Sequence, residues 1–168
     1  MENTQQTQGF SLIELLITIA IAGVLASIAI PNYSTLMANS RASTYANQLM
    51  SDLRYARSLA IMENNTVTIC QPTALGASTC DNTSTWQKGW SVVSATTNTV
   101  KRNFQFNSTL TAVTNQGISI SGGAQNYLIF TGNGMTSPVS TSTYTFNIKP
   151  TGCTSGYAIT IPPDGQMT

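Results

Sequence analysis

The ionisable and nucleophilic side chains of this 168-residue chain are few, and they allow only a narrow chemistry. The sequence has no histidine, so it lacks the usual base of Ser-His-Asp and Cys-His nucleophiles and the commonest zinc ligand. Its six acidic residues include no pair at a spacing suited to general acid–base catalysis. The sequence therefore predicts no catalytic residue, no metal site and no cofactor, and it argues against an enzyme.

The three cysteines lie in the last hundred residues of the chain. Cys70 and Cys80 flank a loop, residues 71–79, that is rich in Thr, Ala, Gly and Ser. In an oxidising compartment we expect a disulfide between these two, and two free buried thiols are the alternative. Cys153 would then be unpaired, and we expect it to serve as a small buried apolar residue because no histidine could activate it.

Glu14 is the only charged residue between residues 10 and 30. A helix of this length spans roughly 30 Å, the thickness of a bilayer core, so the segment could be a plain membrane anchor or a signal peptide. Either interpretation leaves the carboxylate without a partner in an apolar environment, which is costly. Cleavage between Gly9 and Phe10 would create an amine four residues from Glu14, and the two charges could pair within a chain or between neighbouring chains.

The elements that must position these residues begin with one long helix. Residues 10–31 form its apolar part, and Pro31 predicts a kink rather than an end. Residues 32–63 form an amphipathic part, which the turn-forming pair Asn64-Asn65 ends. Its apolar stripe contains Ala42, Tyr45, Ala46, Leu49, Leu53, Ala56 and Ala60. We expect Asp52 and Arg54 at or beyond the edges of the stripe, and Arg41, Arg54 and Arg57 on a solvated face.

Residues 64–168 are expected to form a β-rich domain. Only 8% of the chain is charged, and short polar side chains with Gly and Pro turns separate short β-branched runs. This spacing favours antiparallel sheets packed on the amphipathic helix, which is an α+β fold. The expected strands cover residues 66–70, 89–93, 101–106, 117–121, 127–131, 143–148 and 157–161.

The N-terminal residues carry a family resemblance. Gly9-Phe10-Ser11-Leu12-Ile13-Glu14, followed by an apolar run to Pro31, resembles the class III signal of type IV prepilins and pseudopilins. Further motifs are similar to the GspH/FimT branch of minor pilins and pseudopilins: Ala56-Arg57-Ser58-Leu59-Ala60, Val67-Thr68-Ile69-Cys70, and Trp86 with Gly89-Trp90. The resemblance implies the pilin fold, with residues 1–9 as a leader peptide.

The resemblance also implies a function as a structural subunit. A prepilin peptidase would cut after Gly9 and methylate the new N-terminal residue, Phe10. The subunit would be held in the bacterial inner membrane by a single span with a periplasmic β domain. Glu14 would then guide its assembly with major and minor pilins into a type IV pilus or similar filament. A type II secretion pseudopilin is the alternative, although Pro31 looks more typical of a pilus.

DNA binding for natural transformation is a further alternative from the same family. There the resemblance predicts a Gly-Arg-x-Arg tail, whereas this chain matches only Gly165 and has neither arginine. A weak DNA contact would have to use Lys88, Lys101 and Arg102. Phosphate-driven binding needs several clustered cations, so the sequence argues against nucleic acid as a partner.

Overall fold

A computed structural model describes residues 10–74, 76–81, 86, 89–105, 118–121, 127–137, 143–150 and 156–168. The chain forms two compact units, Met1–Met37 and Ala38–Thr168. Gly9, Lys88 and Cys153, to which the sequence analysis assigned roles, lie outside the described residues.

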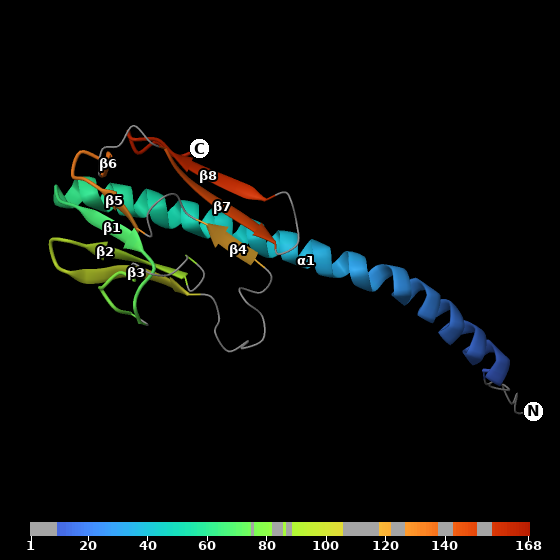
Figure 1. Ribbon diagram of the computed structural model, residues 1–168. Helices are drawn as coiled ribbons and strands as arrows, with labels where there is room; N and C mark the ends of the chain where they lie inside the picture. Colours follow the sequence, from blue (N-terminus) through green and yellow to red (C-terminus); the bar gives the residue numbers. More distant parts are fainter. Residues whose placement is uncertain are drawn as a thin grey trace, which may run out of the picture. The chain divides into compact units, whose positions relative to one another are not determined.

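Helix α1, Leu12–Glu63, is the single helix of the described chain and contributes to both units (Figure 1). It continues through Pro31, so the expectation that this residue does not end the helix is confirmed, while the kink stays a prediction. The transmembrane role expected for residues 10–31 is not shown by the structure, in which we find no described helix long and apolar enough to cross a membrane.

The C-terminal end of α1 is formed by the predicted asparagine pair. Asn64 has a φ of 46°, in the left-handed region that Asn tolerates better than most residues. Its backbone N–H donates to the Ile61 carbonyl, and that of Asn65 donates to the Ala60 carbonyl, each at 3.2 Å. These bonds satisfy carbonyls that a helix end would leave unpaired, so the helix stops here.

The predicted stripe on the second half of α1 is buried, which confirms this face as the one packed on the domain. Leu49 and Leu53 are fully buried and Tyr45 is half-buried. The alanines of the stripe allow the sheet to approach the helix closely because they carry no bulk beyond Cβ. These buried alanines are Ala42, Ala46, Ala56 and Ala60.

The larger sheet has five antiparallel strands in the order β3-β2-β1-β5-β6. Its strands are β1 (Val67–Cys70), β2 (Gly89–Ser94), β3 (Thr99–Gln105), β5 (Tyr127–Phe130) and β6 (Thr136–Ser137). Four of them match expected strands within two residues. Strand β6 was not expected from the sequence, because a strand of two residues is too short to show an alternating pattern.

The smaller sheet has three antiparallel strands in the order β4-β7-β8. These are β4 (Ile118–Ser121), β7 (Tyr144–Pro150) and β8 (Tyr157–Ile161), each close to an expected strand. Figure 1 shows the second half of α1 running beside strands of both sheets. The α+β fold with antiparallel sheets on a long helix is therefore confirmed.

One apolar core joins the helix to both sheets. Trp90 is completely buried and stacks on Phe104 with ring centroids 4.4 Å apart. Trp86 meets Phe146 of the smaller sheet edge-on at 4.8 Å, and Tyr45 of the helix meets Phe104 at 5.8 Å. The two tryptophans are thus core residues rather than a ligand platform.

Candidate functional site: the N-terminal helix and the polar clamps of the domain

The first turn of α1 is organised by Ser11 and Glu14. Ser11 precedes the first helical residue, and its carbonyl accepts from the backbone N–H groups of Glu14 at 3.1 Å and Leu15 at 3.2 Å. Ser11 thus occupies the N-cap position and Glu14 the third helical position, a spacing that favours a helix start. A carboxylate there also faces the positive end of the helix dipole. This part of the local role of Glu14 could have been found in the Ser-x-x-Glu spacing.

The side chains that follow this turn are uncovered apolar groups. Phe10 is 87% exposed and Leu12 is 77% exposed. The other large apolar side chains described up to Ile28 are exposed as well, namely Ile13, Leu15, Leu16, Ile17, Ile19, Ile21, Val24 and Leu25. A helix surface of this kind is stable in water only when other apolar groups cover it, so it is a candidate interaction surface.

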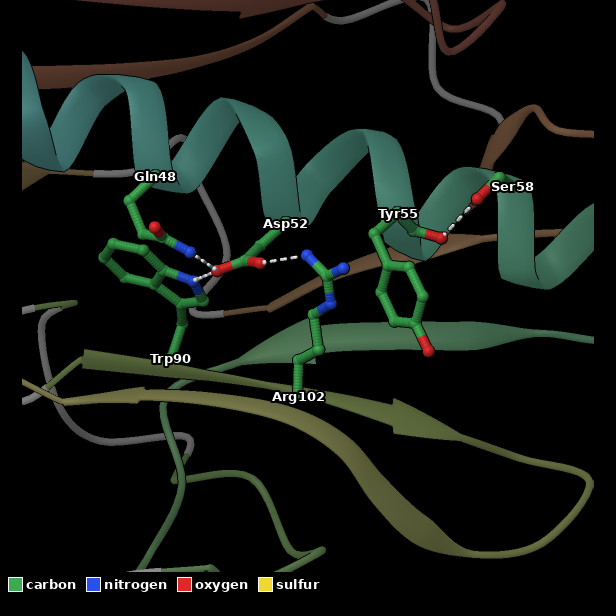
Figure 2. A network of polar contacts seen from close by, with 6 residues as sticks. All are labelled: Gln48, Asp52, Tyr55, Ser58, Trp90 and Arg102. Atoms are coloured by element: carbon green, nitrogen blue, oxygen red, sulfur yellow. Dashed lines mark hydrogen bonds and ion pairs between the residues drawn. The ribbon is translucent and has the colours of Figure 1, made fainter.

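The buried carboxylate of Asp52 is the centre of a polar network between α1 and the larger sheet (Figure 2). Its Oδ2 accepts from Gln48 Nε2 at 3.0 Å and from the buried indole Nε1 of Trp90 at 2.9 Å. Its Oδ1 accepts from Arg102 Nη1 of β3 at 3.0 Å. The Arg102 guanidinium also lies 4.0 Å from the centre of the Tyr55 ring, at cation–π distance.

Asp52 corrects one expectation from the sequence. We placed it at the edge of the apolar stripe or beyond, but it is 2% exposed and faces the sheet. A buried carboxylate is tolerated only when its oxygens are hydrogen-bonded and its charge is paired, which the three donors achieve here. The spacing of Gln48 and Asp52 signals a local pair, but the partners Trp90 and Arg102 come from distant strands and give no local signal.

A second polar clamp joins the end of α1 to strands β2 and β3. The carboxylate of Glu63 accepts a hydrogen bond from Ser94 Oγ and lies 3.9 Å from Lys101 Nζ. The bond from Ser94 is the main cause that lowers the pKa of Glu63 below its ordinary value; Thr96 and Lys101 act in the same direction, and partial burial opposes them. Glu63 therefore remains ionised at neutral pH and ties the helix to the sheet.

These clamps engage two of the three cations proposed for a weak DNA contact. Lys101 lies beside Glu63, and Arg102 pairs with Asp52. Lys88 is outside the described residues. A DNA contact through this set stays a prediction that the structure does not favour, because a phosphate would have to compete with carboxylates already in place.

The arginines of the helix divide into two kinds. Arg41 and Arg54 are exposed, as expected for a solvated face. Arg57 is half-buried instead and donates from Nε to the Gly134 carbonyl at 2.9 Å and from Nη2 to the Asp164 carbonyl at 3.2 Å. For Arg57 the expectation of a solvated face is therefore wrong, because these carbonyls belong to segments that the sequence places far from the helix.

The reactive groups of Cys70, Cys80 and Tyr144 are held in a disulfide or buried in the core. Cys70 and Cys80 form the predicted disulfide, with their Cα atoms 5.7 Å apart. Burial is the main cause that raises the pKa of the Tyr144 phenol, and the neighbouring Tyr127 adds to it, so Tyr144 stays neutral in the core. Within the described ranges, no group of three or more Cys, Asp or Glu residues could hold a metal ion. The arrangement suits attachment and assembly better than covalent chemistry.

Comparisons with known proteins match both parts of the chain. Residues 45–165 match the family model described as type II transport protein GspH, and residues 5–30 match the prokaryotic N-terminal methylation motif. A search of curated proteins found no match. Two crystal forms of the Pseudomonas aeruginosa type IV minor pilin FimU share the fold at 24% identity. Their TM-scores are 0.53 and 0.54, covering 75% and 77% of this chain and 90% and 87% of theirs.

Proposed function

The chain belongs to the GspH family of minor pilins and pseudopilins and carries the N-terminal methylation motif, and from this membership we propose that it is a minor pilin of a type IV pilus or similar filament. Cleavage after Gly9 leaves Phe10 as a methylated N-terminal residue. The exposed apolar side chains of the first half of α1 then pack against other pilins. The subunit acts by assembly, and its partners are the prepilin peptidase and neighbouring major and minor pilins.

The observation that carries this proposal is the position of Glu14 in the first turn of an uncovered apolar helix. Apolar packing between helices is non-directional and would allow many registers. One carboxylate close to one terminal amine adds a directional contact, because a misplaced subunit would leave both charges unpaired in an apolar environment. Glu14 therefore sets the register in which a new subunit docks.

Before assembly, the same helix holds the subunit in the inner membrane as a single span, with the β domain in the periplasm. The support for this placement is the N-terminal methylation motif over residues 5–30 and the exposed apolar side chains that follow Phe10. Lipid and neighbouring pilins would cover the same side chains in turn. The disulfide between Cys70 and Cys80 is consistent with an oxidising periplasm.

The assembly role predicts that Glu14→Ala is processed but absent from filaments. Mass spectrometry of the mature N-terminus measures cleavage at Phe10, and immunoblots of sheared filaments measure incorporation. Thr18→Ala is the matched control, because Thr18 lies one turn further along the helix and its hydroxyl donates to the Leu15 carbonyl of the same helix. Normal incorporation of Glu14→Ala would contradict the proposed role of the carboxylate.

A type II secretion pseudopilin is the second candidate, because the matching family model is described by that transport system. The two functions differ in what a deletion removes. Loss of a minor pilin reduces the number of surface pili, whereas loss of a pseudopilin retains exoproteins inside the cell envelope. Counting pili and assaying secreted enzymes in one deletion strain separates the two.

A further inference from the structure

A groove of about 380 Å³ lies between α1 and the C-terminal segment of the chain. The helix contributes Arg54, Arg57, Ser58 and Ile61. Their spacing of three and four residues puts them on one helix face, next to the face that packs on the core. The other wall consists of residues 165–167.

The walls of this groove are held in place by side-chain and backbone hydrogen bonds to main-chain carbonyls. Arg57 bonds to the Gly134 and Asp164 carbonyls, and Thr168 exchanges two backbone bonds with Thr160 of β8, at 2.9 and 3.1 Å. Gly165 has a φ of 74°, and a Cβ there would lie 2.2 Å from the Gly134 carbonyl oxygen. The segment therefore fits only with glycine at this point, and the groove exists before any ligand arrives. A preformed site loses less entropy on binding.

The groove combines positive charge with apolar surface. Arg54 is exposed and forms no hydrogen bond or ion pair within the described part of the chain, and no carboxylate is among the lining residues. The nearby carboxylate of Asp164 accepts from the Gln166 backbone N–H at 2.9 Å instead. Ile61 is 50% exposed and Met167 is half-buried, so both offer apolar contact beside the guanidinium groups.

We propose that this groove binds an extended segment of a neighbouring filament subunit that carries a carboxylate side chain beside an apolar one. A carboxylate would accept from Arg54 and from the guanidinium N–H groups that Arg57 does not use, while the apolar side chain covers Ile61 and Met167. This inference rests on the proposed function in one respect, namely that the partner is a filament subunit. The preference for an acidic peptide follows from the lining residues of the groove and does not depend on that function.

Charge complementarity favours a peptide over nucleic acid here. Lys101 and Arg102 are paired with Glu63 and Asp52. Arg41 lies 13 positions before Arg54 on the helix, about 20 Å away at 1.5 Å per residue. Among the described lining residues the cations are Arg54 and Arg57, and two guanidinium groups suit one or two carboxylates better than a phosphate backbone.

The probe is a fluorescein-labelled peptide of three Leu-Glu repeats with blocked ends, and the matched control peptide has Gln in place of Glu. Fluorescence anisotropy with the full chain in a neutral detergent, at about 150 mM NaCl, measures the Kd. We expect saturable binding of the acidic peptide and at least about tenfold weaker binding of the amide peptide. Equal binding of both peptides, or none of either, overturns the proposal.

Variants at Arg54 tie the binding to this groove. Arg54→Glu is expected to raise the Kd by about tenfold or more, and Arg54→Lys by less, because the charge is kept but the bidentate geometry is lost. Arg41→Glu makes the same charge change on the same helix outside the groove and should leave the Kd unchanged. A similar rise in the Kd for Arg54→Glu and Arg41→Glu would mean that the peptide is held by general electrostatic attraction, and it would overturn the assignment of binding to this groove. Arg57 is unsuitable for substitution because it also holds the wall.

Two further measurements keep the alternatives apart. In the first, a 12-nucleotide single-stranded DNA competes with the labelled peptide for the protein. If the DNA displaces the labelled peptide at a lower concentration than unlabelled peptide does, the groove binds nucleic acid and the proposal of a peptide ligand is wrong. Glu14→Ala should bind the peptide as tightly as the unaltered chain, because the helix residues that line the groove, Arg54 to Ile61, belong to the second half of α1. The filament immunoblot therefore detects a failure of assembly, and the anisotropy assay separately detects a failure of peptide binding.

Discussion

At the scale of single residues, Asp52 shows how this domain handles a buried charge. Burial of an isolated carboxylate is strongly unfavourable, and each of its oxygens here receives a donor from a different part of the fold. Trp90 and Arg102 reach it from β2 and β3, so the residue specifies which strands lie against the helix. The network also gives the buried indole N–H of Trp90 a hydrogen-bond acceptor in the core.

Replacement of Asp52 tests this network. Asp52→Ala should lower the free energy of unfolding by about 2–4 kcal/mol, because it removes the acceptor of the buried Trp90 hydrogen bond and the ion-pair partner of Arg102. Asp52→Asn keeps an acceptor for Trp90 and should cost less. Urea unfolding of the full chain in detergent, followed by tryptophan fluorescence, measures both. Arg41→Ala is the surface control, and a loss below about 0.5 kcal/mol for Asp52→Ala would refute the role assigned to the network.

Glu63 predicts an acid-sensitive contribution to stability. The pKa of Glu63 in the folded chain is lowered, chiefly by the hydrogen bond from the Ser94 hydroxyl. The ionised carboxylate therefore stabilises the fold fully at any pH above the pKa of the unfolded chain, which is near 4.5. That stability is lost as the pH falls through the lower folded pKa. Urea midpoints between pH 7 and pH 3 should fall less steeply in Glu63→Gln than in the unaltered chain. Identical slopes would show that the Ser94 bond does not contribute.

At the scale of elements, the two halves of α1 differ in what covers them. The second half has one buried stripe and one polar face, so its packing partner is the domain itself. The first half has exposed apolar side chains around its whole circumference, so its sequence does not define one face that would pack on the domain. Ser11 and Asn64 define the two ends of the helix by local hydrogen bonding. The C-terminal end was therefore predictable from the Asn64-Asn65 pair alone.

The β2–β3 pair depends on a glycine at its start. Gly89 has a φ of 111°, and a Cβ there would lie 2.1 Å from the Phe104 carbonyl oxygen. Gly76 also has a positive φ, of 73°, but open space surrounds its Cβ position. Gly76→Ala should therefore cost only about 1 kcal/mol of backbone strain, and Gly89→Ala clearly more.

Thermal unfolding by circular dichroism compares these two glycine variants directly. Because Gly89 opens β2 next to Trp90, its substitution should also change the near-UV signal of the aromatic core, which Gly76→Ala should leave alone. Equal shifts in Tm for the two variants would mean that backbone conformation, and not the close strand approach, decides the effect.

At the scale of the whole molecule, the surfaces proposed for assembly and for peptide binding lie on different parts of the chain. The first half of α1 carries the exposed apolar side chains and Glu14, while the second half of α1 and residues 165–167 line the basic and apolar groove. Among the described residues of the domain, Asp52 pairs with Arg102, and Glu63 lies beside Lys101. Arg54 is exposed and lines the groove, whereas Arg41 is exposed and lies outside it.

The sequence by itself determined the features that depend on local pattern. Apolar spacing predicted the helix and its buried stripe, β-branched runs predicted seven of the eight strands in the described part of the chain, and the loop between Cys70 and Cys80 predicted the disulfide. The N-terminal motif predicted the family. In each case the signal arises from neighbours in the chain, so the fold need not be known to detect it.

Only the tertiary structure decided which polar residues meet. Two of the three donors to Asp52, Trp90 and Arg102, lie 38 and 50 positions away, and the carbonyls that Arg57 contacts lie 77 and 107 positions away. Such pairs form because strand order and helix packing bring distant backbone segments together. The burial of Asp52, the fixed position of Arg57 and the groove beside Arg54 are all consequences of that packing, which no local spacing encodes.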